Sequence, residues 1–180
     1  PAGYRDPGVI THFWKIVEYY HATSFSGVPT LYTNLLRVPV DADIHSLNMA
    51  VCGAAPMPVE VFTTFEQRTS AHILEGYGLT EATCASSTNP RYGERRVGSI
   101  GLRYPYQAMK AVVLDQRGRS VRDCRPDETG TLVVKGPNVF AGYVQEEQNA
   151  GLWVAEGWLN TGDLGRQDED GYFWLSGRTK

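Results

Sequence analysis

The chain has 180 residues, of which 42% are hydrophobic and 21% charged, and its formal net charge is −3. This composition is typical of one globular domain, or two small ones, with a true apolar core. No dense run of Lys and Arg occurs, so the sequence lacks the basic patch of a protein that binds nucleic acid or an anionic membrane. The arginines Arg91, Arg95 and Arg96 are expected to lie in a solvated turn.

No stretch reaches the roughly 18 apolar residues of a membrane span, and the N-terminus lacks the pattern of a signal peptide. The three cysteines, Cys52, Cys84 and Cys124, lack C-x-x-C spacing and are expected to be reduced thiols. Together these features favour a cytoplasmic protein. Because the chain opens with Pro1 and stops at Lys180 directly after a motif, we expect both ends to come from a longer protein.

The first half of the chain is expected to alternate helices and strands. Apolar side chains recur at helical spacing from Val9 to Tyr20, which predicts an amphipathic helix with its aromatic residues in the core. A second short helix through Leu31 and Leu35 is expected to end before Pro39.

A short apolar run, Met49–Cys52, follows and predicts a strand buried on both faces. A helix is expected at Val59–Thr69 and a strand at His72–Glu75. The helix is expected to turn three side chains inward: Val59, Phe62 and Phe65. Strand, helix and strand with short connections predict a parallel sheet, in which ligands bind beyond the C-terminal strand ends.

From about Val97 the pattern changes to short apolar runs separated by glycines, as at Ala111–Leu114 and Thr131–Val134. Asp170 and Gly171 separate two runs near the end of the chain and predict a β-hairpin. The expected fold is therefore α/β. A parallel-sheet α/β part, residues 1–96, is followed by a β-rich, barrel-like part, residues 97–180.

The segment Glu75–Glu81 has the densest group of residues that could bind a nucleotide. Tyr77 stands between two glycines at a strand end, so its ring could stack on a flat base. Thr80 and Glu81 offer hard oxygen ligands suited to phosphate and Mg²⁺. The alternative is a glycine turn with a buried tyrosine and an ordinary helix start.

Three further positions each allow a functional and a structural interpretation. Asp163 could accept hydrogen bonds from both ribose hydroxyls, or could bond its own backbone in a turn. Arg178 could hold phosphate or ribose oxygens, or be a solvated charge. The small residues Gly53–Pro56 could lie against a flat group, or form a packing turn. No nucleophile elbow, zinc-protease motif or P-loop is present in the sequence.

Taken in order, these motifs resemble the adenylate-forming superfamily, which includes acyl-CoA synthetases, luciferases and the adenylation domains of peptide synthetases. The resemblance runs from about Val28 to the last residue and depends on these segments: Gly27–Thr30, Gly53–Pro56, Gly76–Glu81, Val97–Gly101, Gly142–Tyr143, Gly157–Asp163, Asp170–Phe173 and Gly177–Lys180. In that family ATP activates a carboxylic acid as an acyl-adenylate, and the thiol of CoA takes the acyl group. The resemblance implies an acid:CoA ligase that uses ATP, Mg²⁺ and CoA and binds no nucleic acid.

The resemblance also implies individual roles in nucleotide binding. Tyr77 would stack on adenine and Asp163 would take the ribose hydroxyls. Thr80 would contact phosphate, Glu81 would help to hold Mg²⁺, and Arg178 would touch ribose or phosphate. The other residues near the nucleotide would be Gly53, Ala54, Glu75 and Gly76, which would line the adenine slot, and Tyr172.

The acyl pocket would be bordered by small or apolar residues: Val28, Gly53, Gly78, Leu79, Val97 and Gly101. Glycines there would leave room for a sizeable apolar tail, which favours a medium- or long-chain fatty acid, with an aromatic acid as the alternative. A domain that loads a carrier protein, or a non-catalytic nucleotide-binding module, remains a further alternative. The family's upstream phosphate loop and downstream lysine are not among these residues, so the isolated chain is expected not to turn over and to bind ATP weakly, if at all.

Overall fold

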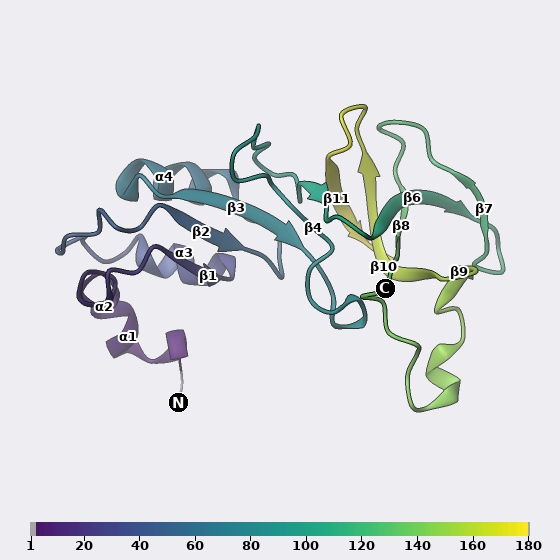
Figure 1. The fold of residues 1–180 in the computed structure, drawn as a ribbon, viewed down its shortest axis with the longest axis horizontal. Helices are drawn as coiled ribbons and strands as arrows, with labels where there is room; N and C mark the ends of the chain where they lie inside the picture. Colours follow the sequence, from purple (N-terminus) through teal and green to yellow (C-terminus); the bar gives the residue numbers. More distant parts are fainter. Residues whose placement is uncertain (1–2, 180) are drawn as a thin grey trace. The chain divides into compact units, whose positions relative to one another are not determined.

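The computed structural model describes residues 3–179, which form two compact units (Figure 1). The first unit ends at Glu75 and the second begins at Gly76. This division differs from the boundary expected after residue 96. The intervening segment belongs with the β-rich part, because its strand β4 (Ser87–Thr88) pairs with β5 (Leu102–Arg103). Each unit has its own apolar core.

The first unit contains a three-stranded parallel sheet with the order β1-β2-β3. Its elements in chain order are η1 (Gly3–Arg5), α1 (Pro7–Thr11), α2 (Phe13–Tyr20), β1 (Ser24–Gly27), α3 (Pro29–Leu35), β2 (Met49–Cys52), α4 (Val59–Thr69) and β3 (His72–Tyr77). The predicted parallel sheet is confirmed. Strand β1 was not predicted, because Phe25 is its one large apolar residue.

The predicted helix from Val9 to Tyr20 is two helices that meet at His12. The amide of His12 donates to carbonyls of α1, and its own backbone, at φ −106° and ψ 12°, leaves the helical region. The predicted core face is therefore wrong in part. Tyr20 is 72% exposed, whereas Trp14 is 2% exposed and packs in the core of the first unit.

Phe65 lies at the centre of the first unit's core, which joins the helices to one face of the sheet. Its ring centroid is 5.0 Å from that of Tyr32 and 6.1 Å from those of Trp14 and Phe25. The Tyr32 hydroxyl donates to the Val51 carbonyl at 2.7 Å. Burial, with a smaller contribution from Cys52, raises the pKa of Tyr32 far above its usual value.

Two burial predictions in this unit are wrong. Val59 is 58% exposed, because it opens the first turn of α4 instead of facing the core. Strand β2 is buried on one face only. Ala50 and Cys52 are fully buried in the core, while Met49 and Val51 on the other face are half-buried.

The second unit is built on an antiparallel sheet with the order β11-β10-β8-β6-β7, and β9 adds to β10. After β4 and β5, its elements are β6 (Ala108–Leu114), β7 (Ser120–Asp123), β8 (Gly130–Lys135), η3 (Glu146–Asn149), β9 (Trp153–Ala155), β10 (Trp158–Gln167) and β11 (Phe173–Arg178), and the short η2 (Thr80–Ala82) precedes β4. The predicted hairpin at Asp170 and Gly171 is confirmed as β10–β11.

The expected β-rich part is confirmed, but among the described strands its sheet is open and does not form a closed barrel. The sheet does not close because β7 and β11 lie at opposite edges of the strand order. Strand β7 is mostly exposed and offers no apolar face on which a barrel could close. The three cysteines are free, as predicted. None of the helices within residues 3–179 combines the length and apolar character needed to cross a membrane.

Candidate functional site

Asp163 lies at a β-bulge in β10. The register against β8 shifts between Asn160 and Leu164, and Gly162 between them has φ +74°. The Asn160 side chain accepts the Gly162 amide at 3.0 Å, and the Thr161 hydroxyl accepts the Asp163 amide at 3.1 Å. A bulge redirects a side chain out of the regular alternation. Here the Asp163 residue is left only 4% exposed.

Both carboxylate oxygens of Asp163 bind residues that are distant along the chain. The Tyr77 hydroxyl donates to Oδ2 at 2.6 Å, and Nε of Arg178 donates to Oδ1 at 2.6 Å. The side chain is therefore not a turn aspartate bonded to its own backbone. Each carboxylate oxygen can accept a second hydrogen bond, which leaves capacity for ligand hydroxyls.

The charges in this cluster are well defined near neutral pH. Burial raises the pKa of Tyr77 well above its usual value, and the hydrogen bond to Asp163 raises that pKa further. The hydrogen bond to Asp163 also raises the pKa of Arg178. Tyr77 is therefore a neutral donor and Arg178 a cation whose side chain is still 74% exposed.

A cavity of about 400 Å³ lies beside this cluster within the second unit. Its volume is in the range of small-molecule sites. Arg178 lines the cavity and so connects it to Asp163, while Glu81 and Tyr143 contribute to the same lining. Further lining residues include Leu79, Leu152, Asn160, Thr161, Gly162 and Thr179. The lining thus includes the carboxylate of Glu81 and the guanidinium of Arg178.

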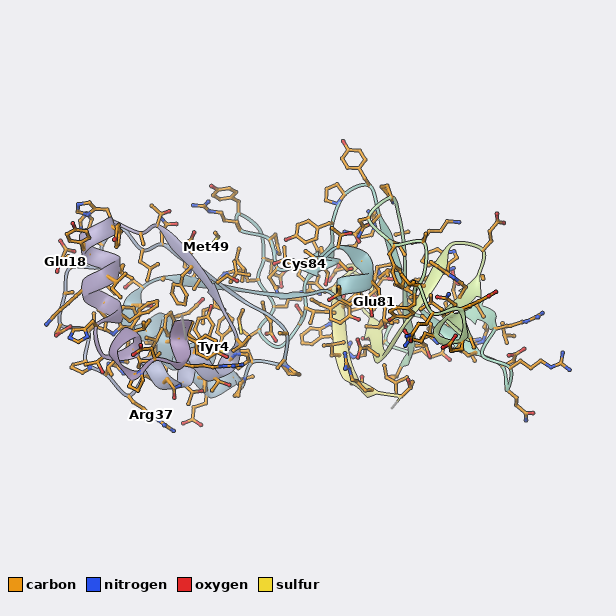
Figure 2. The ribbon with its side chains drawn as sticks, turned by 90° about the horizontal axis from the view of Figure 1, so that it is seen from below. Tyr4, Glu18, Arg37, Met49, Glu81 and Cys84 are labelled. Carbon is orange, nitrogen blue, oxygen red and sulfur yellow. The ribbon has the colours of Figure 1, made fainter. Side chains whose placement is uncertain are left out.

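Glu81 lies on the short η2 turn, with Cys84 just beyond it (Figure 2). The Tyr143 hydroxyl donates to Oε1 of Glu81, and this contact raises the pKa of Tyr143. Thr80 is exposed on the same turn and is not among the cavity-lining residues. Sequence reasoning did not single out Tyr143 as a site residue. The sequence feature that could have identified Tyr143 is the Gly142–Tyr143 pair, one of the segments on which the family resemblance depends.

Tyr172 does not join this group. It is 6% exposed, and its hydroxyl donates to the Glu94 carbonyl at 2.5 Å. The Arg96 guanidinium lies 4.2 Å from the centre of its ring. Arg96 also pairs with Asp168 at 2.8 Å and Asp170 at 2.7 Å, so the expectation of a solvated turn is wrong for this arginine.

Two glycines of the expected acyl pocket are explained by close backbone contacts. A Cβ on Gly78 would lie 1.4 Å from the Cys84 carbonyl oxygen, and one on Gly101 would lie 2.0 Å from the Thr88 carbonyl carbon. Their missing side chains therefore face neighbouring backbone and are not themselves a sign of room for an acyl tail. Val97, from the same expected pocket, is 39% exposed.

Four of the expected site residues belong to the first unit. Val28 precedes α3 in an extended conformation, and Gly53 donates its amide to the Gly27 carbonyl at 3.3 Å. Ala54 adopts a left-handed conformation with φ +69° in the turn after β2. Glu75 is 2% exposed and accepts the Met57 amide at 3.1 Å, which gives it a structural role at the end of β3. Gly76, the first residue of the second unit, pairs with Thr88.

The side chains that line the cavity fit a Mg²⁺ ion that is already bound to a phosphate-containing ligand. Glu81 is the one carboxylate in the cavity lining, and residues 3–179 contain no cluster of three or more His, Cys, Asp or Glu that could hold a metal. Mg²⁺ commonly takes one or two protein carboxylates and completes its shell with water and substrate phosphates. The site is therefore suited to a metal–polyphosphate complex.

The sequence of this chain is similar to those of several known proteins. The chain is 49% identical over 179 residues to the marinolic acid–CoA ligase of Pseudoalteromonas sp. (strain SANK 73390) and 36% identical over 168 residues to a long-chain-fatty-acid–CoA ligase of Bacillus subtilis (strain 168). These matches cover 99% and 92% of this chain but only 27% and 29% of the relatives.

A solved structure agrees with the sequence comparison. ATP-bound MatB from Rhodopseudomonas palustris superposes with a TM-score of 0.83 at 30% identity, over 97% of this chain and 33% of that one. The family model described as AMP-binding enzyme matches residues 3–144, most of the chain. Because this family model matches more than half of the chain, the chain that carries the Tyr77–Asp163–Arg178 cluster belongs to the AMP-binding enzyme family.

Proposed function

We propose that this chain is the nucleotide-holding part of an ATP-dependent acid:CoA ligase. The observation that carries the proposal is the convergence of Tyr77, Asp163 and Arg178 beside a cavity whose lining includes Glu81. These residues come from separate parts of the second unit and offer an aromatic ring, a buried acid, a cation and a metal-binding carboxylate. The combination matches the base, ribose and phosphates of a nucleotide.

Each part of the nucleotide has a proposed partner. The Tyr77 ring would stack on adenine, and Asp163 would accept the ribose hydroxyls through the lone pairs left free by its two present partners. Arg178 would contact ribose or phosphate, and Thr80 would donate to phosphate. Gly76, the first residue of the second unit, would border the adenine slot.

Glu81 would hold Mg²⁺ together with the phosphates, and the metal would supply neutralisation of phosphate charge. The residues of this chain contribute mainly position and electrostatics. Arg178 places a positive charge on the cavity wall, and Asp163 fixes the orientation of that guanidinium. In the proposed reaction the substrate carboxylate attacks the α-phosphate and pyrophosphate leaves. The CoA thiol then attacks the acyl carbon of the acyl-adenylate, and AMP leaves.

A medium- or long-chain fatty acid is the proposed acid. Its support is the similarity to the long-chain-fatty-acid–CoA ligase of Bacillus subtilis (strain 168). Within the second unit, Gly78, Leu79, Val97 and Gly101 would border the proposed pocket. Because backbone contacts explain Gly78 and Gly101, the preference for a long tail depends on that relative and not on these glycines.

Binding and turnover test the proposal in sequence. AMP and ATP·Mg²⁺ are titrated into the protein that carries this chain, and ligand-observed NMR monitors the titrations. We expect binding of both ligands. Asp163→Asn should weaken both. A protein that binds neither ligand, or an Asp163→Asn variant that binds them as the wild type does, would contradict the nucleotide site.

Pyrophosphate release with a series of acids from acetate to palmitate tests the acid and the acceptor. We expect the protein that carries this chain, complete with the segments its relatives possess, to prefer the longer acids and to form a thioester with CoA. If pyrophosphate is released with an aromatic acid but with none of the fatty acids, the fatty-acid proposal is wrong. Transfer to a carrier-protein thiol instead of CoA would overturn the ligase assignment in favour of an adenylation domain.

A further inference from the structure

Tyr143 makes a specific contact with one oxygen of the proposed metal-binding carboxylate. Its hydroxyl donates to Oε1 of Glu81, while no other hydrogen bond to the Glu81 carboxylate is recorded within the described residues. Both side chains line the cavity. The contact therefore engages Oε1 and leaves Oε2 without a protein hydrogen bond among residues 3–179.

Tyr143 is itself held in place by Asn149. The Asn149 side chain accepts the Tyr143 amide at 2.7 Å and donates to the Tyr143 carbonyl at 3.0 Å. Gly142 before it has φ +132°, and a Cβ there would lie 2.9 Å from the Asn149 side-chain oxygen. The Phe140 ring packs edge-on against the Tyr143 ring, with centroids 4.9 Å apart. These contacts hold the tyrosine in place within the loop between β8 and β9 (light green in Figure 1).

The same loop is bonded to the turn that carries Glu81. The Phe140 amide donates to the Glu81 carbonyl at 2.9 Å. The Thr83 hydroxyl donates to the Asn138 carbonyl at 2.6 Å, and the Asn138 side chain donates to the Ala82 carbonyl at 2.9 Å. Thr83 has φ +53°, a conformation that is sparsely populated outside glycine and that surrounding contacts must maintain. Backbone and side chain of Glu81 are therefore both positioned by this loop.

We propose that Tyr143 is a positioning residue that orients the Glu81 carboxylate toward the metal–triphosphate group of the nucleotide. This inference rests on the proposed function. A glutamate side chain loses considerable rotamer freedom when it is ordered. Because the Tyr143 hydroxyl already restricts Glu81, less freedom remains to be lost when metal and phosphates bind. The effect is confined to ligands that need the metal.

The test compares ATP·Mg²⁺ with metal-free AMP. Isothermal titration of Tyr143→Phe, in the protein that carries this chain, should show ATP·Mg²⁺ binding weakened roughly five-fold, the size of one hydrogen bond. Binding of AMP in EDTA should be unchanged, because AMP uses the Tyr77 and Asp163 contacts. Tyr106→Phe is the matched control, since it removes the same atom from a side chain of a residue that is 93% exposed.

Two further variants separate positioning from direct contact with the ligand. Asn149 does not line the cavity, and Asn149→Ala removes the contacts that hold Tyr143. This variant should therefore also lower the affinity for ATP·Mg²⁺. In a Glu81→Gln background, Tyr143→Phe should have little additional effect on ATP·Mg²⁺ affinity. If Tyr143→Phe fails to fold, Asn149→Ala decides the question by the same comparison.

Four outcomes overturn the inference. They are an unchanged affinity for ATP·Mg²⁺, a tighter one, an equal loss for AMP, and a full additional effect of Tyr143→Phe in the Glu81→Gln background. A tighter affinity would show that Tyr143 competes with the metal. A wild-type protein that binds neither AMP nor ATP·Mg²⁺ overturns the proposed function and this inference together. Normal wild-type binding with an unaffected variant overturns the inference alone.

Discussion

The two units of the molecule differ in what their interiors contain. The first unit surrounds Phe65 with aromatic and aliphatic side chains, and its buried polar residues are Thr69 and Glu75. The second unit buries Asp163 and a hydrogen-bonded polar group formed by Ser87, Asn89 and Ser99. In the first unit, therefore, packing dominates. In the second, the interior depends on specific donors and acceptors.

This contrast suggests where each kind of substitution should act. A buried polar group is costly unless its hydrogen bonds are satisfied, so residues such as Asp163 are retained where they do more than fill space. An apolar core tolerates changes of identity better than changes of volume. We expect substitutions in the first unit to change stability, and substitutions around Asp163 to change ligand affinity.

Phe65→Ala should have the largest effect. Phe65 is fully buried, and its removal should lower the free energy of unfolding by about 3–5 kcal/mol through lost burial and a residual cavity. Urea denaturation followed by circular dichroism measures the loss. Val59→Ala on the same helix, at a position that is 58% exposed, should change stability by less than about 1 kcal/mol. Equal losses would contradict the packing of this core.

Asp163→Asn should have the next largest effect, on affinity. Removing the charge weakens the hydrogen bonds that the carboxylate would make with ribose, by about 1.5–3 kcal/mol, or roughly ten-fold or more. Titration of AMP measures the loss. Glu156→Gln is the control, because it removes the same charge from an exposed residue of the same unit and should leave AMP affinity unchanged. An equal effect of both variants would indicate a general charge effect.

Two variants of Tyr77 divide the roles of its ring and hydroxyl. Tyr77→Ala removes the proposed stacking surface and should weaken AMP binding by about 1–3 kcal/mol. Tyr77→Phe keeps the ring and loses only the bond to Asp163, so stability should fall by about 1 kcal/mol while AMP affinity changes less than in the alanine variant. If both variants bind AMP equally, the ring does not stack on the base.

A smaller effect should appear at alkaline pH, and it compares one tyrosine from each unit. Burial raises the pKa values of both Tyr32 and Tyr77 above their usual value near 10. Each folded tyrosine then holds its proton more tightly than the unfolded one. The stabilisation from these raised pKa values is fully present below about pH 10 and is lost as the pH rises above it. At pH 10.5 the free energy of unfolding should be lower by less than about 1 kcal/mol for each tyrosine.

Chemical denaturation between pH 8 and pH 10.5 measures this loss. Tyr32→Phe and Tyr77→Phe should each reduce the slope above pH 10, and Tyr106→Phe, at a residue that is 93% exposed, should not. A slope that is the same in all three variants would mean that neither buried tyrosine controls alkaline stability.

Local pattern was enough to predict most of the fold. Glycine punctuation and apolar runs predicted the parallel sheet, helix α4 and the β10–β11 hairpin, all of which are observed. Periodicity failed at His12, where the helix breaks, and at β1, which has too few apolar residues to be recognised. Whether the β-rich sheet closes into a barrel could not be predicted, because closure depends on pairing between the edge strands, which no local pattern encodes.

The sequence proposed a set of site residues but could not give the contacts between them. Tyr77, Glu81, Asp163 and Arg178 were all chosen from motifs, whereas the contact of Tyr143 with Glu81 was not anticipated. Tyr172, which was expected near the nucleotide, packs against Arg96. A motif identifies the chemistry of a residue, but its partners depend on where bulges and loops direct the side chain.

The sequence by itself determined the order of the elements, the two kinds of sheet and the family to which the motifs belong, because these follow from short-range patterns. Only the tertiary structure decided that Tyr77 meets Asp163 across 86 positions and that Tyr143 meets Glu81 across 62. The physical reason is that such contacts require a bulge in β10 and a docked loop after β8. Those features position side chains to within the length of a hydrogen bond, which spacing along the chain cannot specify.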